Sequence, residues 1–271
     1  MDPRLQRRVQ RYGWDKAVPF YEAYWKDQLA PAQSRVLELA ALRSGERVLD
    51  IACGTGLVTF PAADLVGKDG LVVATDISDK MIEFIHQDAS NRSITHVRAM
   101  QMDAESLDVV DEYFDVSICS LGLMYTPYPL QAVREMHRSV VAGGRAVAAV
   151  WGSRSNCGWS GIFPVVDSRV STDVCPLFFQ LGTGDLLKST FEQAGFSRVH
   201  TERIPTVLKY ETPEAACGAA FAGGPVALAY DKFDEETRAS AFADYLETIE
   251  SFRKGTSYAI PGEFVIVQGW R

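Results

Sequence analysis

The sequence has few cysteines, and none of them are paired at short spacing. Cysteine occurs five times among 271 residues. The positions are Cys53, Cys119, Cys157, Cys175 and Cys217. No two of them form a C-x-x-C pair, so the sequence indicates neither a zinc site nor a disulfide framework. We therefore expect reduced thiols, as in proteins of a reducing compartment.

The sequence also lacks a long apolar run. The charged start, residues 1–4, is followed by no apolar segment, so we expect no signal peptide. The nearest approach to a membrane span, residues 215–230, is uncharged but contains three glycines and a proline. It therefore falls short of the ~18 apolar residues that a membrane span needs. We predict a cytoplasmic protein without a membrane span.

An excess of positive charge is absent as well. Lysine and arginine number 27 against 35 aspartates and glutamates, which gives a net charge of −8. With 47% hydrophobic and 23% charged residues, the composition is that of a globular protein rather than a disordered chain or a coiled coil. The acidic balance argues against a nucleic-acid partner. The clustered arginines Arg4, Arg7, Arg8 and Arg11 are predicted to form a solvated helix face.

Apolar residues at helical spacing dominate the N-terminal part of the chain. They predict two short helices within residues 2–30, with one break at Gly13 and another near Pro19. Pro31 is predicted to open a further helix through Leu42, because proline suits the first helical turn. We assign residues 1–45 to an N-terminal helical cap.

From Arg47 onward, short apolar runs alternate with segments of helical spacing. The expected strands are residues 48–52, 71–75, 96–101, 113–119 and 145–151, and the expected helices are 57–66, 79–89 and 128–141. Gly143 and Gly144 are predicted to form the turn into the fifth strand. This alternation is typical of an α/β fold, a mostly parallel sheet covered by helices on both faces. We assign residues 46–152 to the ligand-binding core.

The C-terminal part, residues 153–271, is predicted to complete the sheet within one compact domain. A loop-rich stretch is followed by a helix over residues 184–194 and a long strand over residues 196–209. Residues 213–255 have helical character, and a last strand covers residues 263–270. This order predicts a terminal strand pair with an inserted helical lid that covers an apolar substrate chamber.

The most informative segment joins the first strand to its helix. Asp50 ends the strand, and the small-residue turn Cys53-Gly54-Thr55-Gly56 follows it. In open α/β sheets, ligands bind at this edge, and glycines let the backbone approach them closely. Asp76 ends the second strand 20 residues beyond Gly56, where a carboxylate can accept two ribose hydroxyls. The sequence therefore predicts a ligand that contains ribose.

The spacing of the glycines decides between two ribose-containing ligands. A dinucleotide site requires G-x-G-x-x-G, but Thr59 stands where its third glycine would be. Asp50 would also repel a pyrophosphate while attracting an ammonium group. Asp103, after the third strand, adds another acid near the expected adenine. Three carboxylates suit a cation with ribose and adenine, which points to S-adenosylmethionine.

Residues 14–151 resemble the class I S-adenosylmethionine-dependent methyltransferases, most of all the ubiquinone/menaquinone-biosynthesis type and its small-molecule relatives. The resemblance implies a Rossmann-like seven-stranded sheet of order 3-2-1-4-5-7-6, with strand 7 antiparallel. It also implies that Asp50, Ala52, Gly54 and Gly56 surround the methionine part of the cofactor. Asp76 would then bind the ribose and Asp103 the adenine amine, and the end of the fourth strand would face the methyl group. The candidate cofactor contacts are Tyr21, Asp50, Ala52, Cys53, Gly54, Gly56, Asp76, Ile77, Met81, Met102, Asp103, Ala104, Ser120 and Leu121.

The residues of the acceptor site are less specific in sequence. The candidate acceptor contacts are Trp14, Trp25, Met124 and Arg154. Asn156 and Trp159 share the loop of Arg154, which either contacts an anionic or aromatic substrate or is an ordinary polar loop. Methyl transfer is an in-line displacement that needs a general base only for a protonated nucleophile, so no catalytic residue is assigned. Tyr125 is the one candidate. The histidines His86, His96, His137 and His200 are expected to be structural, and no metal site is expected.

The sequence thus predicts methyl transfer from S-adenosylmethionine to an O, N or C atom of a small molecule, aromatic or isoprenoid-like in character. One alternative is an NAD(P)-dependent oxidoreductase, and another is a non-catalytic S-adenosylmethionine-binding module. A third, thiol-dependent arsenic methylation, requires Cys157, Cys175 and Cys217 to cluster in space. Homodimer formation is a further expectation.

Overall fold

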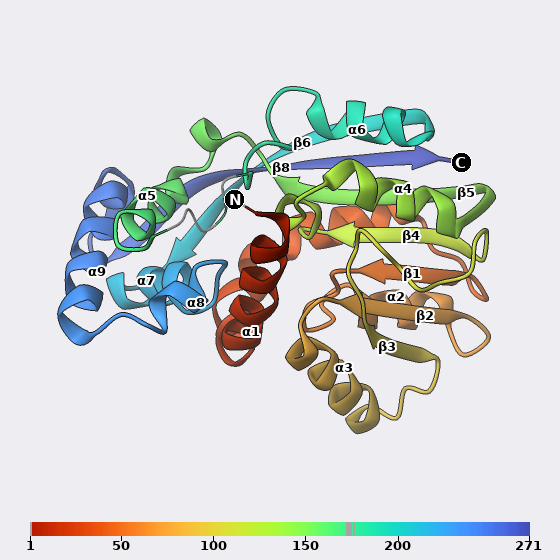
Figure 1. The fold of residues 1–271 in the computed structure, drawn as a ribbon, viewed down its shortest axis with the longest axis horizontal. Coiled ribbons are helices and arrows are strands. Elements are labelled where there is room, and N and C mark those ends of the chain that lie inside the picture. Colours follow the sequence, from red (N-terminus) through yellow and green to blue (C-terminus); the bar gives the residue numbers. More distant parts are fainter. Residues whose placement is uncertain (1, 172–174, 176) are drawn as a thin grey trace.

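The computed structural model describes residues 2–171, 175 and 177–271. Its centre is one twisted sheet with strands in the order β3-β2-β1-β4-β5-β8-β6, and the short β7 pairs with β8 (Figure 1). The parallel strands are β1 (Arg47–Ile51), β2 (Leu71–Asp76), β3 (Val97–Gln101), β4 (Phe114–Ser120) and β5 (Val140–Trp151). The remaining strands are β6 (Ser197–Tyr210), β7 (Arg253–Lys254) and β8 (Ser257–Trp270).

The predicted strand order is confirmed. Strand β8 runs antiparallel to both β5 and β6, as expected for the seventh strand of this architecture. It is numbered eighth only because the two-residue β7 precedes it. The central strands are apolar on both faces, and Val48, Ile118 and Val147 are fully buried. Such strands need helices on both sides of the sheet.

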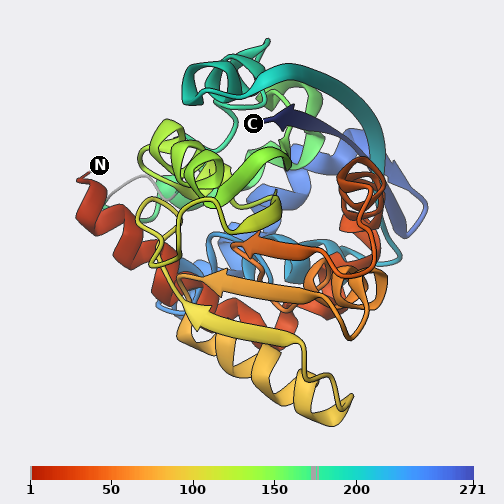
Figure 2. The ribbon, with the colours of Figure 1, turned by 90° about the vertical axis from the view of Figure 1, so that its right-hand side faces the viewer.

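Helices cover both faces of the sheet. Figure 2 shows α4 (Pro129–Ser139) and α6 (Leu186–Ala194) on one face, with α2 (Thr59–Val66) and the C-terminal part of α1 (Pro3–Ala40) on the other. Helix α3 (Asp79–Asn91) packs against β3 and β2 at the edge. No helix of the described residues is both long enough and apolar enough to cross a membrane.

Helix α1 corrects the predicted break in the N-terminal region. It is a continuous 38-residue helix that contains Pro19 and Pro31. Each proline removes one backbone hydrogen bond, but packing of one helix face compensates, since Ala17 is fully buried. Packing does not require glycine at position 13, because a Cβ there would make an ordinary contact with the Leu228 Cβ at 3.7 Å.

The start of β5 also differs from the prediction. Helix α4 ends at Ser139, and the strand begins at once with Val140 instead of after a glycine turn. Gly143 and Gly144 lie inside the strand, where the pairing with β4 shifts register. Gly143 has a φ of +81°, and its N–H donates to the Arg271 carbonyl at 3.0 Å. The C-terminus thus supplies the partner that keeps these glycines in the sheet.

The predicted lid between β6 and β8 is not helical throughout. It contains α7 (Pro213–Phe221), α8 (Ala227–Tyr230), α9 (Glu235–Ile249) and the 3₁₀ turn η4 (Glu250–Phe252). Gly223, Gly224 and Pro225 separate α7 from α8, and the chain turns into β7 at Arg253. Strand β8 then starts at Ser257, six residues before the predicted 263. Its extra residues pair with the end of β6.

The carboxyl ends of the parallel strands face a group of helices. Figure 1 shows α7, α8 and the N-terminal part of α1 at this edge, with α5 (Ile162–Asp167) and α9 farther out. Three 3₁₀ turns follow the strand ends, η1 (Leu123–Tyr125), η2 (Arg154–Asn156) and η3 (Gly158–Gly161). The N-terminal part of α1 and helices from the second half of the chain therefore cover the edge where a ligand of this fold binds.

Candidate active site

One large cavity lies at the carboxyl ends of β1, β2, β4 and β5. It encloses about 1000 Å³ of space not filled by protein atoms, including its open mouth. Helix α1 contributes Gln10, Tyr21 and Trp25 to the wall, and the loop between α7 and α8 contributes Gly224 and Pro225. The cavity is thus built by segments from most of the chain.

Most predicted contacts line this one cavity. The predicted cofactor contacts on the wall are Tyr21, Ala52, Gly54, Asp76, Ile77, Met81, Met102, Asp103, Ala104, Ser120 and Leu121. The predicted acceptor contacts on the wall are Trp14, Trp25 and Met124, together with Tyr125. Asp50, Cys53, Gly56 and Arg154 are not part of the wall.

The turn after β1 forms the floor of the cavity. Its fold depends on left-handed backbone conformations, with φ of +54° at Ala52 and +56° at Gly54. A Cβ at Gly54 would meet nothing nearer than the Tyr21 Cε1 at 3.9 Å, so the missing side chain leaves open space. At Gly56 a Cβ would instead clash with the Phe60 ring. Gly54 therefore opens the cavity, whereas Gly56 serves packing.

The Asp76 carboxylate lies beside the turn that contains Gly54. Its Oδ2 accepts a hydrogen bond from the Gly54 N–H at 3.0 Å, and its Oδ1 accepts one from the Ser78 N–H at 2.9 Å. Burial raises the pKa of this carboxyl to about 6 despite both hydrogen bonds. Each oxygen can accept a further hydrogen bond, so the group can receive two neighbouring hydroxyls.

Asp50 lies behind the wall rather than on it. The residue is only 1% exposed, and its Oδ2 accepts a hydrogen bond from the Thr59 hydroxyl at 2.6 Å. Burial raises the pKa of Asp50 to about 7, and the negative charge of Asp76 adds to the rise. Thr59, at the position where a dinucleotide motif has its third glycine, is thus the partner of this acid.

Asp103 is held by an ion pair that the sequence did not predict. The Arg7 Nε lies 2.8 Å from the Asp103 Oδ2, and the same guanidinium contacts Glu105. Four residues along the helix, Arg11 pairs with Asp79. The predicted solvated face therefore holds for Arg4 and Arg8, which are exposed. It fails for Arg7 and Arg11, which tie α1 to the loop after β3 and to the start of α3.

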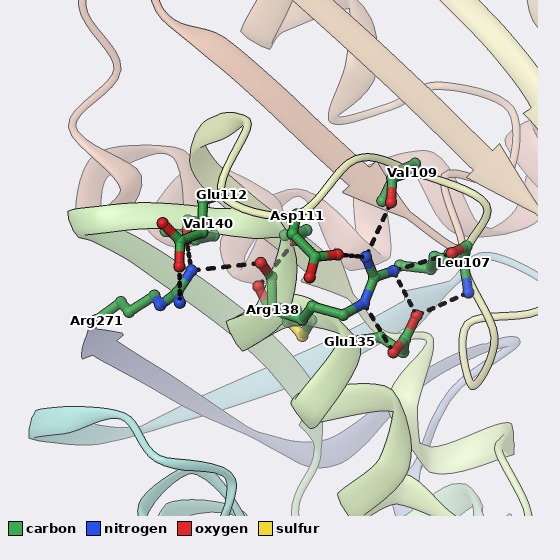
Figure 3. A network of polar contacts seen from close by, with 10 residues as sticks. Leu107, Val109, Asp111, Glu112, Glu135, Arg138, Val140 and Arg271 are labelled. Carbon is green, nitrogen blue, oxygen red and sulfur yellow. Dashed lines mark hydrogen bonds and ion pairs between the residues drawn. The ribbon is translucent and has the colours of Figure 1, made fainter.

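The loop that carries Asp103 is anchored on its far side by Arg138 of α4. Figure 3 shows the Arg138 guanidinium donating to the backbone carbonyls of Leu107 and Val109 and pairing with Glu135 and Asp111. The Leu107 N–H in turn donates to the Glu135 Oε2 at 2.9 Å. Charge-assisted bonds of this kind are strong and directional. They fix the loop whose first residues form the cavity wall.

The rest of the cavity is aromatic. Trp25, Trp151 and Trp159 form a mutually edge-on cluster with ring centroids 5.0–6.2 Å apart. Phe178 packs edge-on against Trp159 and against Tyr125, at 5.4 Å in both cases. Burial raises the pKa of the Tyr125 phenol well above its ordinary value. Tyr125 lines the cavity wall as a protonated phenol at neutral pH, and its role in catalysis stays a prediction.

Arg154 does not reach this cavity, contrary to the prediction. Its guanidinium lies over the Phe179 ring at 5.1 Å and the Phe163 ring at 5.9 Å. These cation–π contacts hold the guanidinium against two rings that do not line the cavity. In this segment, Trp159 lines the wall. The sequence left open whether Trp159 contacts the substrate or belongs to an ordinary loop.

Several wall residues have no clear signal in the sequence. They are Arg7, Gln10, Leu29, Gly122, Thr126, Pro127, Trp151, Phe178, Gly224 and Pro225. Gly122 is required because a Cβ there would collide with the side chain of Ala52. Gly122 is the one of these residues that the sequence indicates best, since it lies two residues after the buried strand β4.

The cysteines give no support for arsenic chemistry. Cys157, Cys175 and Cys217 are free and buried, and burial raises the pKa of each thiol. Their surroundings differ: the Cys175 Sγ accepts a hydrogen bond from the Gln10 amide, whereas Cys217 lies in the core on α7. Within residues 2–171, 175 and 177–271, no group of three or more His, Cys, Asp or Glu residues has the arrangement of a metal site.

Similarity to known proteins agrees with this geometry. Residues 48–144 match the family model described as a methyltransferase domain. Over 178 residues, the chain is 33% identical to a ubiquinone/menaquinone biosynthesis C-methyltransferase of Azotobacter vinelandii, covering 60% of this chain and 70% of that protein. The chain belongs to the class I S-adenosylmethionine-dependent methyltransferases. As a member, it is an enzyme that transfers a methyl group from S-adenosylmethionine to a small-molecule acceptor.

Two further similarities concern this methyltransferase. It is 32% identical over 132 residues to the aklanonic acid methyltransferase of Streptomyces sp., covering 49% of this chain and 60% of that protein. Its fold is similar to that of phosphoethanolamine N-methyltransferase 2 of Haemonchus contortus in complex with S-adenosyl-L-methionine, with a TM-score of 0.62. That match covers 95% of this chain and 57% of the other at 14% identity, so it shows the fold alone. These similarities give no support to the oxidoreductase alternative.

Proposed function

We propose that this methyltransferase acts on a neutral aromatic or isoprenoid-like acceptor bound among the tryptophans of the cavity. The observation that carries this proposal is the distribution of charge on the wall. Of the described wall residues, only Arg7, Asp76 and Asp103 are charged. Arg7 and Asp103 pair with each other, and Asp76 lies against Gly54. The aromatic part of the cavity has no counter-charge, so it favours a neutral, flat, apolar molecule.

We further propose how the cofactor is held. The free lone pairs of Asp76 accept the two ribose hydroxyls, and the open space above Ala52 and Gly54 receives the methionine part. The apolar side chains of Ile77, Met81, Met102 and Ala104 enclose the adenine, with the Asp103 carboxylate near its amine. Tyr21, Ser120 and Leu121 border the methyl group. When bound, S-adenosylmethionine supplies a methyl group on a positively charged sulfur.

In this proposal, the predicted cofactor residues that do not line the wall act through their neighbours. Asp50 is a positioning residue that holds the start of α2 through Thr59 and adds negative charge beneath the cofactor. The backbone of Cys53 continues the turn, and Gly56 allows that turn to pack against Phe60. None of the three needs to touch the cofactor in order to shape its site.

The acceptor must bring its own reactivity. The described wall has no histidine, lysine or glutamate, and burial raises the phenol pKa of both Tyr21 and Tyr125. No wall group other than the ribose-binding Asp76 and the paired Asp103 can therefore accept a proton near pH 7. An electron-rich ring carbon, or a hydroxyl that ionises by itself, meets this condition. The protein's part is to align acceptor and methyl group and to exclude water.

A turnover assay tests the proposed acceptor class. Purified enzyme and S-adenosylmethionine are incubated with phenols, quinols and primary amines of matched size, and S-adenosylhomocysteine is quantified. We expect methylation of phenols or quinols and none of the amines. Methylation of charged amines alone would contradict the proposal. The Trp25→Ala variant should lose turnover and keep its affinity for S-adenosylhomocysteine, because Trp25 belongs to the aromatic cluster.

Other features stay predictions. They are a cytoplasmic location, the absence of a nucleic-acid partner, which the net charge of −8 supports, and a homodimer. Residues 1–45 as a cap, 46–152 as a core and 213–255 as a lid are likewise a proposed division of one compact domain. In this division only the loop between α7 and α8 of the lid meets the cavity, because the buried residues of α7 pack into the core.

A further inference from the structure

Among the described residues, four buried polar side-chain atoms of the cavity wall have no hydrogen-bond partner, namely Arg7 Nε, Gln10 Oε1, Ser120 Oγ and Trp159 Nε1. The Arg7 Nε is paired with Asp103 at 2.8 Å, and Ser120 borders the proposed cofactor site. The indole Nε1 of Trp159 and the amide Oε1 of Gln10 remain for the acceptor part of the cavity. Each residue is only 4% exposed, and both line the cavity. Buried polar groups are normally hydrogen-bonded, because an unpartnered one lowers stability. One unsatisfied donor and one unsatisfied acceptor in a single apolar cavity thus indicate a ligand with complementary atoms.

Neither atom has a partner among residues 2–171, 175 and 177–271. The Gln10 amide is oriented by its other end, since Nε2 donates to the Cys175 Sγ at 3.3 Å. The Trp159 ring is fixed by edge-on contacts with Trp151 at 5.0 Å and Phe178 at 5.4 Å. Both atoms therefore keep their positions.

Trp25, in the same cluster, provides the internal comparison. Its indole Nε1 donates to the Ala219 carbonyl at 3.2 Å, so the protein satisfies this N–H itself. Trp25 and Trp159 are otherwise alike, since both are buried, both line the cavity and their centroids are 6.2 Å apart. The unsatisfied N–H of Trp159 is therefore a specific feature and not a general property of the cluster.

We propose that the Trp159 Nε1–H donates to a carbonyl oxygen of the methyl acceptor and that the Gln10 Oε1 accepts from its hydroxyl. The acceptor is then a flat, neutral hydroxyaryl ketone or a quinol derivative that retains a carbonyl. Polar groups placed in an apolar pocket give specificity, because an analogue without the matching atom leaves them unpaired. This inference rests on the proposed function and narrows its substrate class.

Four small probes separate the two contacts. They are 6-hydroxy-2-acetonaphthone, with both groups, 2-acetonaphthone, with the carbonyl only, 2-naphthol, with the hydroxyl only, and naphthalene, with neither. Binding is measured by calorimetry to the wild-type enzyme saturated with S-adenosylhomocysteine, so that no turnover occurs. We expect the first probe to bind most tightly, the two probes with a single group less tightly, and naphthalene least tightly.

Two variants assign each contact to its residue. Trp159→Phe should weaken binding of the two carbonyl probes about threefold to tenfold and leave 2-naphthol unchanged, as loss of one neutral hydrogen bond does. Gln10→Leu should weaken the two hydroxyl probes by a similar factor and leave 2-acetonaphthone unchanged. Trp25→Phe is the matched control, and its effect should be the same on all four probes. Unchanged affinity for S-adenosylhomocysteine shows that each variant is folded.

The outcomes separate this inference from the proposed function. The probes could bind the wild-type enzyme while both variants weaken the binding of all four probes equally or weaken the binding of none. Either result overturns the assignment of the two contacts and leaves the aromatic site in place. If no probe binds while S-adenosylhomocysteine does, both the aromatic acceptor class and the two contacts are overturned.

Discussion

At the scale of single residues, Asp50 and Asp76 have the same chemistry but different surroundings. Asp76 accepts two backbone hydrogen bonds at the cavity wall, whereas Asp50 has one hydroxyl partner behind it. Burial raises the pKa of Asp76 to about 6 and that of Asp50 to about 7. The ionised forms of both are therefore held at a cost in stability, which a cationic ligand above them would offset.

This cost gives a prediction for Asp50→Asn in the ligand-free protein. The folded-state pKa of Asp50 lies above its unfolded value of 3.8, so its ionisation lowers stability progressively as pH rises from about 4 to about 7. Asparagine stays neutral and can still accept from the Thr59 hydroxyl. We expect the variant to gain Tm, and the gain to be larger at pH 8 than at pH 5 by at least ~4 °C.

Differential scanning fluorimetry at the two pH values measures this difference. The exposed Asp64, changed to Asn, is the control and should show no such pH-dependent gain. A gain for Asp50→Asn that is equal at both pH values would contradict the raised pKa.

The residue scale also shows what sequence could and could not foresee. The glycine turn and the acids at the strand ends were predicted because each depends on neighbours within a few positions. The same pattern predicted that Asp76 lies on the cavity wall. It did not predict that Asp50 lies behind the wall. Its partner Thr59 is nine residues away, and which of the two faces the cavity depends on the packing of α2.

At the scale of elements, α1 is fastened to the cavity loops by charge. Arg7 contacts both Asp103 and Glu105, and Glu105 is only 6% exposed. Removing the guanidinium would leave a buried carboxylate without its cation, although the Tyr128 N–H still donates to it. The helix would then lose its main connection to the loop after β3.

We therefore predict that Arg7→Met lowers the free energy of unfolding by about 1–3 kcal/mol, the usual range for losing a hydrogen bond to a charged group. It should also weaken binding of S-adenosylhomocysteine several-fold, because Asp103 loses its orientation. Urea unfolding and calorimetry measure the two effects. Arg8→Met, one residue along and exposed, is the control and should change neither quantity. Equal effects of the two variants would exclude the ion pair as the cause.

Element boundaries were predicted well only where local pattern decides them. Strands β1 to β4 begin and end within a residue or so of the expected positions. The prediction failed for α1, where tertiary packing overcomes two internal prolines, and for β5, where Gly143 bonds to the last residue of the chain. Both errors come from contacts distant in sequence, which periodicity does not reveal.

At the scale of the whole molecule, the cavity is a product of the complete fold. Gln10, Trp159 and Gly224 come from three distant parts of the chain and line the same cavity. This is why the sequence predicted the cofactor half of the site in detail and the acceptor half only in part. The cofactor half depends on strand ends, whereas the acceptor half depends on how α1 and the β6–β8 excursion fold back.

Hydrogen exchange tests this division. We predict that saturating S-adenosylhomocysteine slows amide exchange in the turn 52–56, in the loop 102–105 and in the N-terminal part of α1. Exchange in α9 should stay unchanged, because no residue of that helix lines the cavity. Mass spectrometry of peptic fragments resolves these segments. Protection spread evenly over α9 and the turn would indicate global tightening and would contradict a site confined to the strand ends and α1.

The most direct test concerns the carboxylate at the end of β2, on which the placement of the cofactor depends. Calorimetric titration of the wild-type enzyme and of Asp76→Ala with S-adenosylmethionine measures its contribution. We predict micromolar affinity for the wild-type enzyme and a loss of at least ~1.4 kcal/mol, about tenfold, in the variant. Equal affinity in a variant with an unchanged Tm would contradict the account, because Asp76 would then not hold the ribose.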